Sequence, residues 1–97
     1  MSAYIMVMVD VNDMEQYRKY MALSPAIVAK FGGKVLTRGG RSEVLEGEAD
    51  SRRKVLVEFP DYETALAFYH SAEYQAAKAV REGAATGTFI ALEGLAS

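Results

Sequence analysis

Two charged residues in strand-like runs, Arg38 and Glu58, are the first candidates for chemistry in this sequence. An arginine in a cavity can hold an anionic substrate through paired hydrogen bonds, and a partly desolvated glutamate can accept a proton. A buried charge is also tolerated when it is simply paired, so these residues could instead form an ion pair that fixes how two subunits dock. Both interpretations stay open, with Arg38 and Glu58 as candidate catalytic residues.

His70 is the only histidine and the third candidate catalytic residue. A histidine can act as a general base, or as a ligand of haem iron. His70 lies at the edge of a buried helical stripe, where a solvent-exposed or simply hydrogen-bonded histidine is the more common case. Because the chain has one histidine and no cysteine, the spacings typical of zinc sites are absent. We therefore predict no metal site and no cofactor.

Six tyrosines are numerous for a chain of this length. Their phenols could orient an aromatic substrate, and Tyr17 and Tyr69, together with Arg38, are our candidates for lining a ligand pocket. At helical spacing, tyrosines are more often core or interface side chains with the hydroxyl at the edge. The run at residues 38–41 (RGGR) lacks the spacing of a phosphate-binding loop and does not open a helix, so a flexible turn explains it.

The composition sets limits on the class of protein. At 97 residues the chain is expected to form a single domain over residues 1–97. Its net charge of −2 has no basic excess, so nucleic acid is not an expected partner. No apolar run approaches a membrane span, and the N-terminus lacks a signal-peptide pattern. A cytoplasmic protein fits best.

Four strands are predicted from β-branched and aromatic runs. A short extra strand or hairpin arm is possible at Ser42–Glu46, and the polar stretch Glu48–Arg53 is interpreted as a solvent loop. The four strands are Ala3–Asp10, Lys34–Arg38, Lys54–Phe59 and Thr88–Glu93.

Two helical regions connect these strands. The first begins near Asn12 or Asp13 and ends at the glycine pair 32–33, which suits the left-handed conformation after a helix. Pro25 interrupts it, so we expect either a kink or a restart with Ser24 as the cap. The second begins after Asp61 and can restart at Ser71.

The resulting order, β-α-β-β-α-β, is that of the ferredoxin-like α+β fold with an antiparallel four-stranded sheet. Right-handed crossovers put both helices on one face, so a second copy of the chain is expected to cover the other. Strand alternation places Val55, Val57 and Phe59 under the helices and Glu58 on the open face. The same alternation predicts Val35 and Thr37 under the helices. It places Lys34, Leu36 and Arg38 on the open face.

Several short motifs together resemble the domain-of-unknown-function 1330 family of short bacterial proteins. They are RGG at 38–40, VLEG at 44–47, EFP at 58–60, AFY at 67–69, SAEY at 71–74 and ATG at 85–87. Ala72 stands where most relatives are expected to carry proline. The family resembles the dimeric α/β-barrel superfamily, whose ferredoxin-like subunits pair their open sheet faces. That superfamily includes cofactor-free monooxygenases, haem-degrading enzymes, isomerases and members without known activity, so the fold implies little about the reaction.

The resemblance departs from the monooxygenases at residues that matter for chemistry. Such enzymes often rely on asparagine and tryptophan, whereas this chain has no tryptophan, and Asn12 is a candidate helix cap. We predict a homodimer that binds or converts a small polar, anionic or aromatic molecule, in a pocket between helices and sheet or in the dimer barrel. The alternative is a non-catalytic binding or regulatory homodimer in which Arg38 and Glu58 form the interface pair.

Overall fold

A four-stranded antiparallel sheet in the order β2-β3-β1-β4 organises the chain. The computed structural model describes residues 1–95. The predicted ferredoxin-like order is confirmed, with the second helical region divided in two. The elements are β1 (Ala3–Val11), α1 (Met14–Lys30), β2 (Lys34–Arg38), β3 (Arg53–Phe59), α2 (Tyr62–His70), α3 (Ala72–Arg81) and β4 (Ala85–Glu93).

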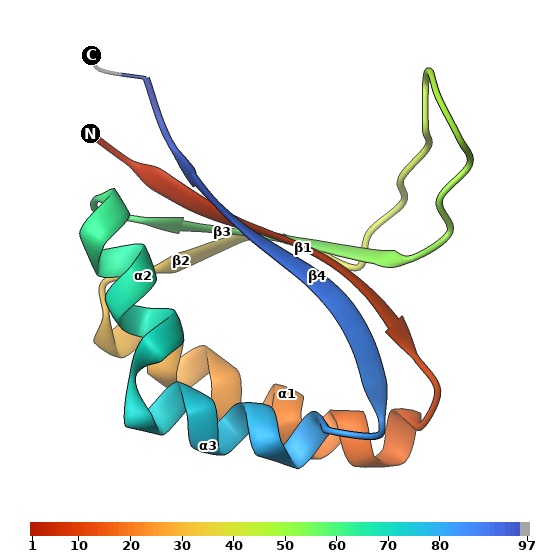
Figure 1. Cartoon of the computed structure of the whole chain (residues 1–97), viewed down its shortest axis with the longest axis horizontal. Helices are drawn as coiled ribbons and strands as arrows, with labels where there is room; N and C mark the ends of the chain where they lie inside the picture. Colours follow the sequence, from red (N-terminus) through yellow and green to blue (C-terminus); the bar gives the residue numbers. More distant parts are fainter. Residues whose placement is uncertain (96–97) are drawn as a thin grey trace.

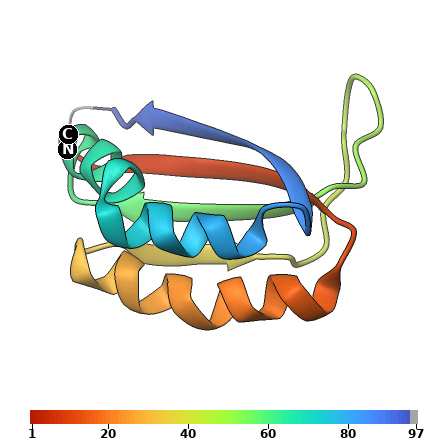
Figure 2. The same cartoon turned by 60° about the horizontal axis from the view of Figure 1, so that its bottom comes forward.

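All three helices cover the same face of the sheet, where α1 runs alongside α3 and α2 stands at an angle to them near the chain termini (Figures 1 and 2). The hydrophobic core lies between the sheet and the helices, where apolar side chains from both are buried away from water. Alternation along β3 is as predicted, with Val57 and Phe59 buried on the helix side. The largest core side chains include Tyr17 and Tyr20 of α1, Phe68 of α2, Tyr74 of α3 and Phe59 of β3.

Side-chain caps set the beginning of each helix. The Asp13 carboxylate accepts from the Gln16 amide at 3.1 Å, and Asp61 accepts from the Thr64 amide at 2.7 Å. The Ser71 hydroxyl accepts from the Tyr74 amide at 3.1 Å, which confirms the predicted restart between α2 and α3. Each cap satisfies an amide that the helix itself leaves without a partner.

Helix α1 runs without a break through Pro25, so of the two alternatives expected there, a kink or a restart, the restart with Ser24 as cap is wrong. Proline removes one backbone donor, but Tyr20 and Val28 are buried in the core on either side of it and hold the helix on the sheet. The helix ends at the glycine pair, as predicted. A side chain at Gly33 would lie 2.7 Å from Phe59, so this position must stay bare for α1 to reach the sheet.

The strands differ from the sequence prediction at several boundaries, and β1 ends at Val11, not Asp10. β4 begins at Ala85, not Thr88, because Ala85 to Gly87 pair with the end of β1. Arg53 is the first residue of β3, not the end of a solvent loop. Residues 39–52 contain no helix or strand, so the predicted strand at Ser42–Glu46 is wrong. This loop projects beyond the sheet, away from the helices, where no strand lies beside it (Figures 1 and 2).

The base of the projecting loop is fixed by Asp50. Its carboxylate accepts from the Arg52 guanidinium at 2.8 Å and lies 3.5 Å from the Lys54 ammonium. Hydrogen bonds from Arg52 hold the pKa of Asp50 well below its usual range.

Within residues 1–95, no helix is both long enough and apolar enough to cross a membrane.

Candidate functional site

A β-bulge in β2 decides where Arg38 points. Val35 pairs with Val57, but the register then shifts, so that Thr37 pairs with Leu56 and Arg38 with Val55. Directly paired residues share a face of the sheet, so Arg38 lies on the helix side and Thr37 on the open side. The prediction for Val35 is confirmed, whereas those for Thr37 and Arg38 are wrong. A bulge inserts one residue and reverses the alternation beyond it.

Glu58 lies away from Arg38, on the other face of the sheet. It pairs with Lys34 at the opposite end of β2 and with Tyr4 of β1. The structure therefore does not bring the two predicted partners together, and Arg38 and Glu58 cannot form the expected pair within one subunit. Lys34 and Tyr4 are the neighbours of Glu58 across the strands.

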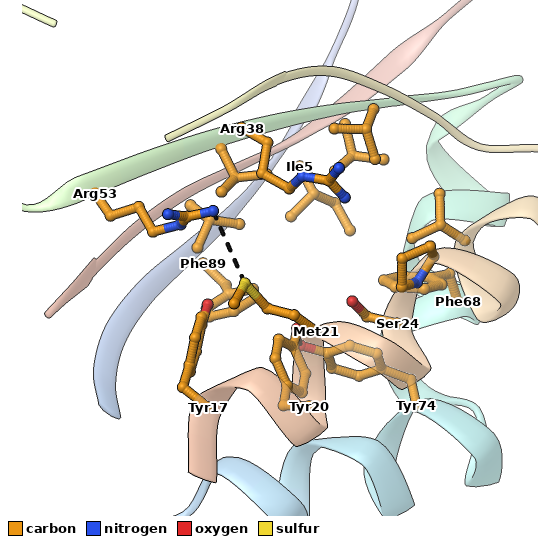
Figure 3. Close-up of a pocket in the computed structure, with 16 residues that line it drawn as sticks. Ile5, Tyr17, Tyr20, Met21, Ser24, Arg38, Arg53, Phe68, Tyr74 and Phe89 are labelled. Atoms are coloured by element: carbon orange, nitrogen blue, oxygen red, sulfur yellow. Dashed lines mark hydrogen bonds between the residues drawn. The ribbon is translucent and has the colours of Figure 1, made fainter. Parts of the chain in front are cut away.

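Arg38 instead lines a pocket between α1 and the sheet, which we call the Arg38–Arg53 pocket (Figure 3). The cavity measures about 70 Å³. β2 and β3 supply its two arginines, and the Ser24 hydroxyl of α1 points into the space. The remaining lining is apolar or aromatic and comprises Ile5, Val7, Tyr17, Tyr20, Met21, Pro25, Val28, Val35, Val55, Val57, Phe68, Tyr74 and Phe89.

The two arginines give this pocket an uncompensated positive charge. Within residues 1–95, neither Arg38 nor Arg53 forms an ion pair, and no carboxylate lines the pocket. Arg53 donates to the Met21 sulfur at 3.8 Å, and its Nε is buried without a partner there. Sulfur is a weak acceptor, so the guanidinium retains donors for an anion. Arg38 is exposed and lies at the mouth.

Tyrosines form the aromatic floor of the pocket. The hydroxyls of Tyr20 and Tyr74 lie 2.8 Å apart and link α1 to α3. Burial raises the pKa of Tyr17, while the nearby charges of Arg53 and Arg81 lower it by less. Burial and the contact with Tyr74 raise the pKa of Tyr20 strongly. Both phenols therefore stay neutral over the physiological range and can act as hydrogen-bond donors.

Arg81 lies behind this floor and is 7% exposed. Its guanidinium donates to the Tyr74 hydroxyl at 3.4 Å and lies over the rings of Phe89 at 4.7 Å and Tyr20 at 5.3 Å. Burial lowers the pKa of Arg81, but the hydrogen bond and charge interactions with Tyr74 and Tyr20 raise it, and the net shift is upward. The guanidinium is therefore a permanent buried cation.

Tyr69 and His70 line a different hollow, between α2, α3 and β4, which we call the α2–β4 groove. His70 is exposed and its ring packs edge-on against Tyr69 at 5.3 Å. Of the predicted site residues, Tyr17 and Arg38 meet in the Arg38–Arg53 pocket. Tyr69 and His70 form a separate pair, and Glu58 belongs to neither place.

Sequence reasoning missed Arg53, because the charged run before it resembles a solvent loop. A signal was nevertheless present, since Arg53 continues the alternation of Val55 and Val57 on the helix side. Arg81 lies on the buried stripe of its helix, but no spacing marks it as a site residue. No group of three or more His, Asp or Glu side chains within residues 1–95 could hold a metal ion.

The geometry of the Arg38–Arg53 pocket is suited to holding a small anion by charge-assisted hydrogen bonds. Neither a carboxylate nor an imidazole lines this pocket in the described part of the chain, while the Ser24 hydroxyl and the phenols of Tyr17, Tyr20 and Tyr74 are its neutral polar groups. The arrangement can therefore bind and orient an anion.

The family model described as "Domain of unknown function (DUF1330)" matches residues 2–95 of the chain. No curated protein matches the sequence. Solved structures give the fold. A protein of unknown function from Rhodopseudomonas palustris is 20% identical, with a TM-score of 0.73 over 99% of this chain and 84% of that one.

Two further solved structures are similar in fold. A dimeric ferredoxin-like protein of unknown function from Jannaschia is 15% identical, with a TM-score of 0.74 over 97% of this chain and 100% of that one. SnoaB, a cofactor-independent oxygenase from Streptomyces nogalater, is 9% identical, with a TM-score of 0.68 over 99% of this chain and 95% of that one. At such identities the likeness establishes the ferredoxin-like fold alone.

Proposed function

The chain belongs to the DUF1330 family, whose description names no activity. From the geometry of the site we propose that the protein binds a small monoanion in the Arg38–Arg53 pocket. The observation that supports this most directly is the presence of two arginines without a counter-charge in an apolar cavity. Within residues 1–95 the Nε of half-buried Arg53 is shielded from water without a partner, which is costly, and a bound carboxylate would supply the missing acceptor. Arg38 at the mouth would orient the anion, and Arg53 would hold it from inside.

The size of the cavity limits the ligand. Its volume of about 70 Å³ is below the roughly 150 Å³ of an apolar cavity that encloses benzene. A carboxylate with a short branched or linear apolar body therefore fits better than an aromatic one. Ser24 and Tyr17 would supply neutral hydrogen bonds to the same ligand, which keeps Tyr17 in the binding role predicted from sequence.

The test is a titration with isobutyrate, followed by calorimetry, with isobutyramide as the uncharged ligand of the same shape. We expect isobutyrate alone to bind, and Arg38→Gln to raise its Kd about tenfold or more, as for the loss of one charge-assisted hydrogen bond. Arg41→Gln is the matched control, because Arg41 is exposed in the loop outside the pocket. Equal binding of the two ligands, or an unchanged Kd in Arg38→Gln, would contradict the proposal.

The assembly that best suits this function is a homodimer formed through the open face of the sheet. Met6, Met8 and Leu56 lie on that face, and Ile90 and Leu92 beside them are 36% and 42% exposed. A second copy would remove these side chains from water. The dimeric Jannaschia structure has the same fold. A cytoplasmic location remains a prediction from sequence.

A further inference from the structure

The α2–β4 groove is a second hollow with its own chemistry. Its volume is about 420 Å³, within the range of roughly 300–1,000 Å³ typical of small-molecule pockets. Small residues create the space: Gly87 and Ala91 lie on the helix side of β4, and Ala65 faces them from α2. Ile5 and Phe89 line both this groove and the Arg38–Arg53 pocket, so they separate the two hollows.

Three basic side chains line the groove at increasing depth. His70 is exposed, Lys78 is half-buried and Arg81 is buried. Lys78 and Arg81 are three residues apart on α3 and therefore share one helix face. Within residues 1–95, none of the three forms an ion pair and no carboxylate lines the groove.

Arg81 is the strongest sign of an anion site, because its charge is only partly satisfied. It is 7% exposed, its Nε is buried without a partner in the described chain, and its one hydrogen bond to a side chain is the 3.4 Å contact with Tyr74. Aromatic rings at 4.7 and 5.3 Å stabilise the cation but accept no conventional hydrogen bond. A guanidinium with free donors on a groove wall is suited to a phosphate or carboxylate.

Lys78 and Tyr69 complete the outer wall. The Lys78 ammonium lies 5.6 Å from the centre of the Tyr69 ring, which keeps the charge beside the groove rather than extended into solvent. Tyr69 and Phe89 also provide aromatic surface along the hollow. The groove therefore combines cationic donors for a multiply charged head with a surface for a planar body.

We propose that the α2–β4 groove binds a small molecule that carries a dianionic phosphate group and a planar apolar body. The phosphate lies between Arg81, Lys78 and His70, and the body packs against Tyr69 and Phe89. The fixed charges of Arg81 and Lys78 match the two charges of a phosphate, and the His70 imidazole adds a further hydrogen-bond partner. The larger volume of this groove admits the planar body that the other pocket excludes. The site is independent of the proposed function, since no arginine or lysine is common to the two hollows.

The test uses phenyl phosphate as the probe, with inorganic phosphate and neutral benzyl alcohol for comparison. His70 is the only histidine, so its ring gives an isolated signal in NMR spectra that reports on the groove. We expect phenyl phosphate to shift this signal saturably, and to bind more tightly than inorganic phosphate. Benzyl alcohol should leave it unshifted. No saturable shift with phenyl phosphate, or equal binding of the two phosphates, would overturn the proposal.

Variants locate the binding within the groove. Lys78→Gln should raise the Kd of phenyl phosphate by roughly tenfold, as for the loss of one charged contact. Lys19→Gln should leave that Kd unchanged, because Lys19 is exposed on α1 and does not line the groove. Arg38→Gln should leave phenyl phosphate binding unchanged although it weakens isobutyrate binding, which separates the two sites. An unchanged Kd in Lys78→Gln, or an equal loss in Lys19→Gln or Arg38→Gln, would contradict the assignment.

Discussion

The buried phenols of α1 and α3 are held in their neutral form, and this has a consequence at alkaline pH. Burial raises the pKa of Tyr17 and Tyr20 above the ordinary value of 10.0. In the unfolded chain both phenols would ionise near that value. A raised pKa in the folded state therefore gives a contribution to stability that is complete below pH 10 and declines as the pH rises further.

Tyr20→Phe separates this titration from the loss of the hydrogen bond to Tyr74. Near pH 8 the variant should be less stable than wild type by about 1 kcal/mol, because the 2.8 Å contact is lost. Above pH 10 the difference should shrink, since wild type then loses the contribution of Tyr20 and the variant has none to lose. Urea unfolding at stepped pH measures both values. A difference that stays constant or grows with pH would contradict this account.

At the scale of elements, the turn after β2 brings Gly39 against the Arg53 guanidinium. Gly39 has φ +67°, and a Cβ there would lie 2.6 Å from the nearest Arg53 nitrogen. Its amide donates to the Lys54 carbonyl at 2.9 Å, which holds β2 beside β3 beyond the bulge. The absence of a side chain at Gly39 therefore leaves room for the Arg53 guanidinium at the wall of the pocket.

Gly39→Ala and Gly47→Ala form a matched pair. Both positions have positive φ, but a Cβ at Gly47 would meet nothing within 4 Å. Each substitution should cost about 1–2 kcal/mol of stability from backbone strain. Only Gly39→Ala should also weaken isobutyrate binding, severalfold, because the guanidinium must move aside. Thermal unfolding and calorimetry give the two readouts, and equal binding by both variants would show that Arg53 does not hold the anion.

Features of single elements differ in whether the sequence predicts them. Alternation on β3 and the cap at Ser71 are local patterns, and both were predicted correctly. The bulge in β2 leaves no such signal, because a five-residue strand KVLTR suits either register. That single inserted residue moved Arg38 from the open face to the pocket, and with it the candidate site. Arg81 was equally hidden, since its surroundings come from three separate elements.

At the scale of the whole molecule, the two faces of the sheet differ in how much apolar surface they leave exposed. The helices bury one face, while the other presents an apolar centre that includes Leu92 and Ile90. The loop at residues 39–52 projects on the same side as this open face (Figure 1), and its Leu45 is 89% exposed. A second copy on the open face would thus lie within reach of the loop.

Dimerisation through this face should make stability depend on protein concentration, because mass action favours the assembled state. We expect Tm to rise with concentration in wild type and sedimentation velocity to give a dimer. Ile90→Lys should yield a monomer, since a lysine in an apolar contact leaves an unpaired charge. Leu23→Lys is the control, because Leu23 is 45% exposed on α1, which covers the sheet face opposite to the open one. A monomeric wild type, or a dimeric Ile90→Lys, would show that the open face is not the contact between copies.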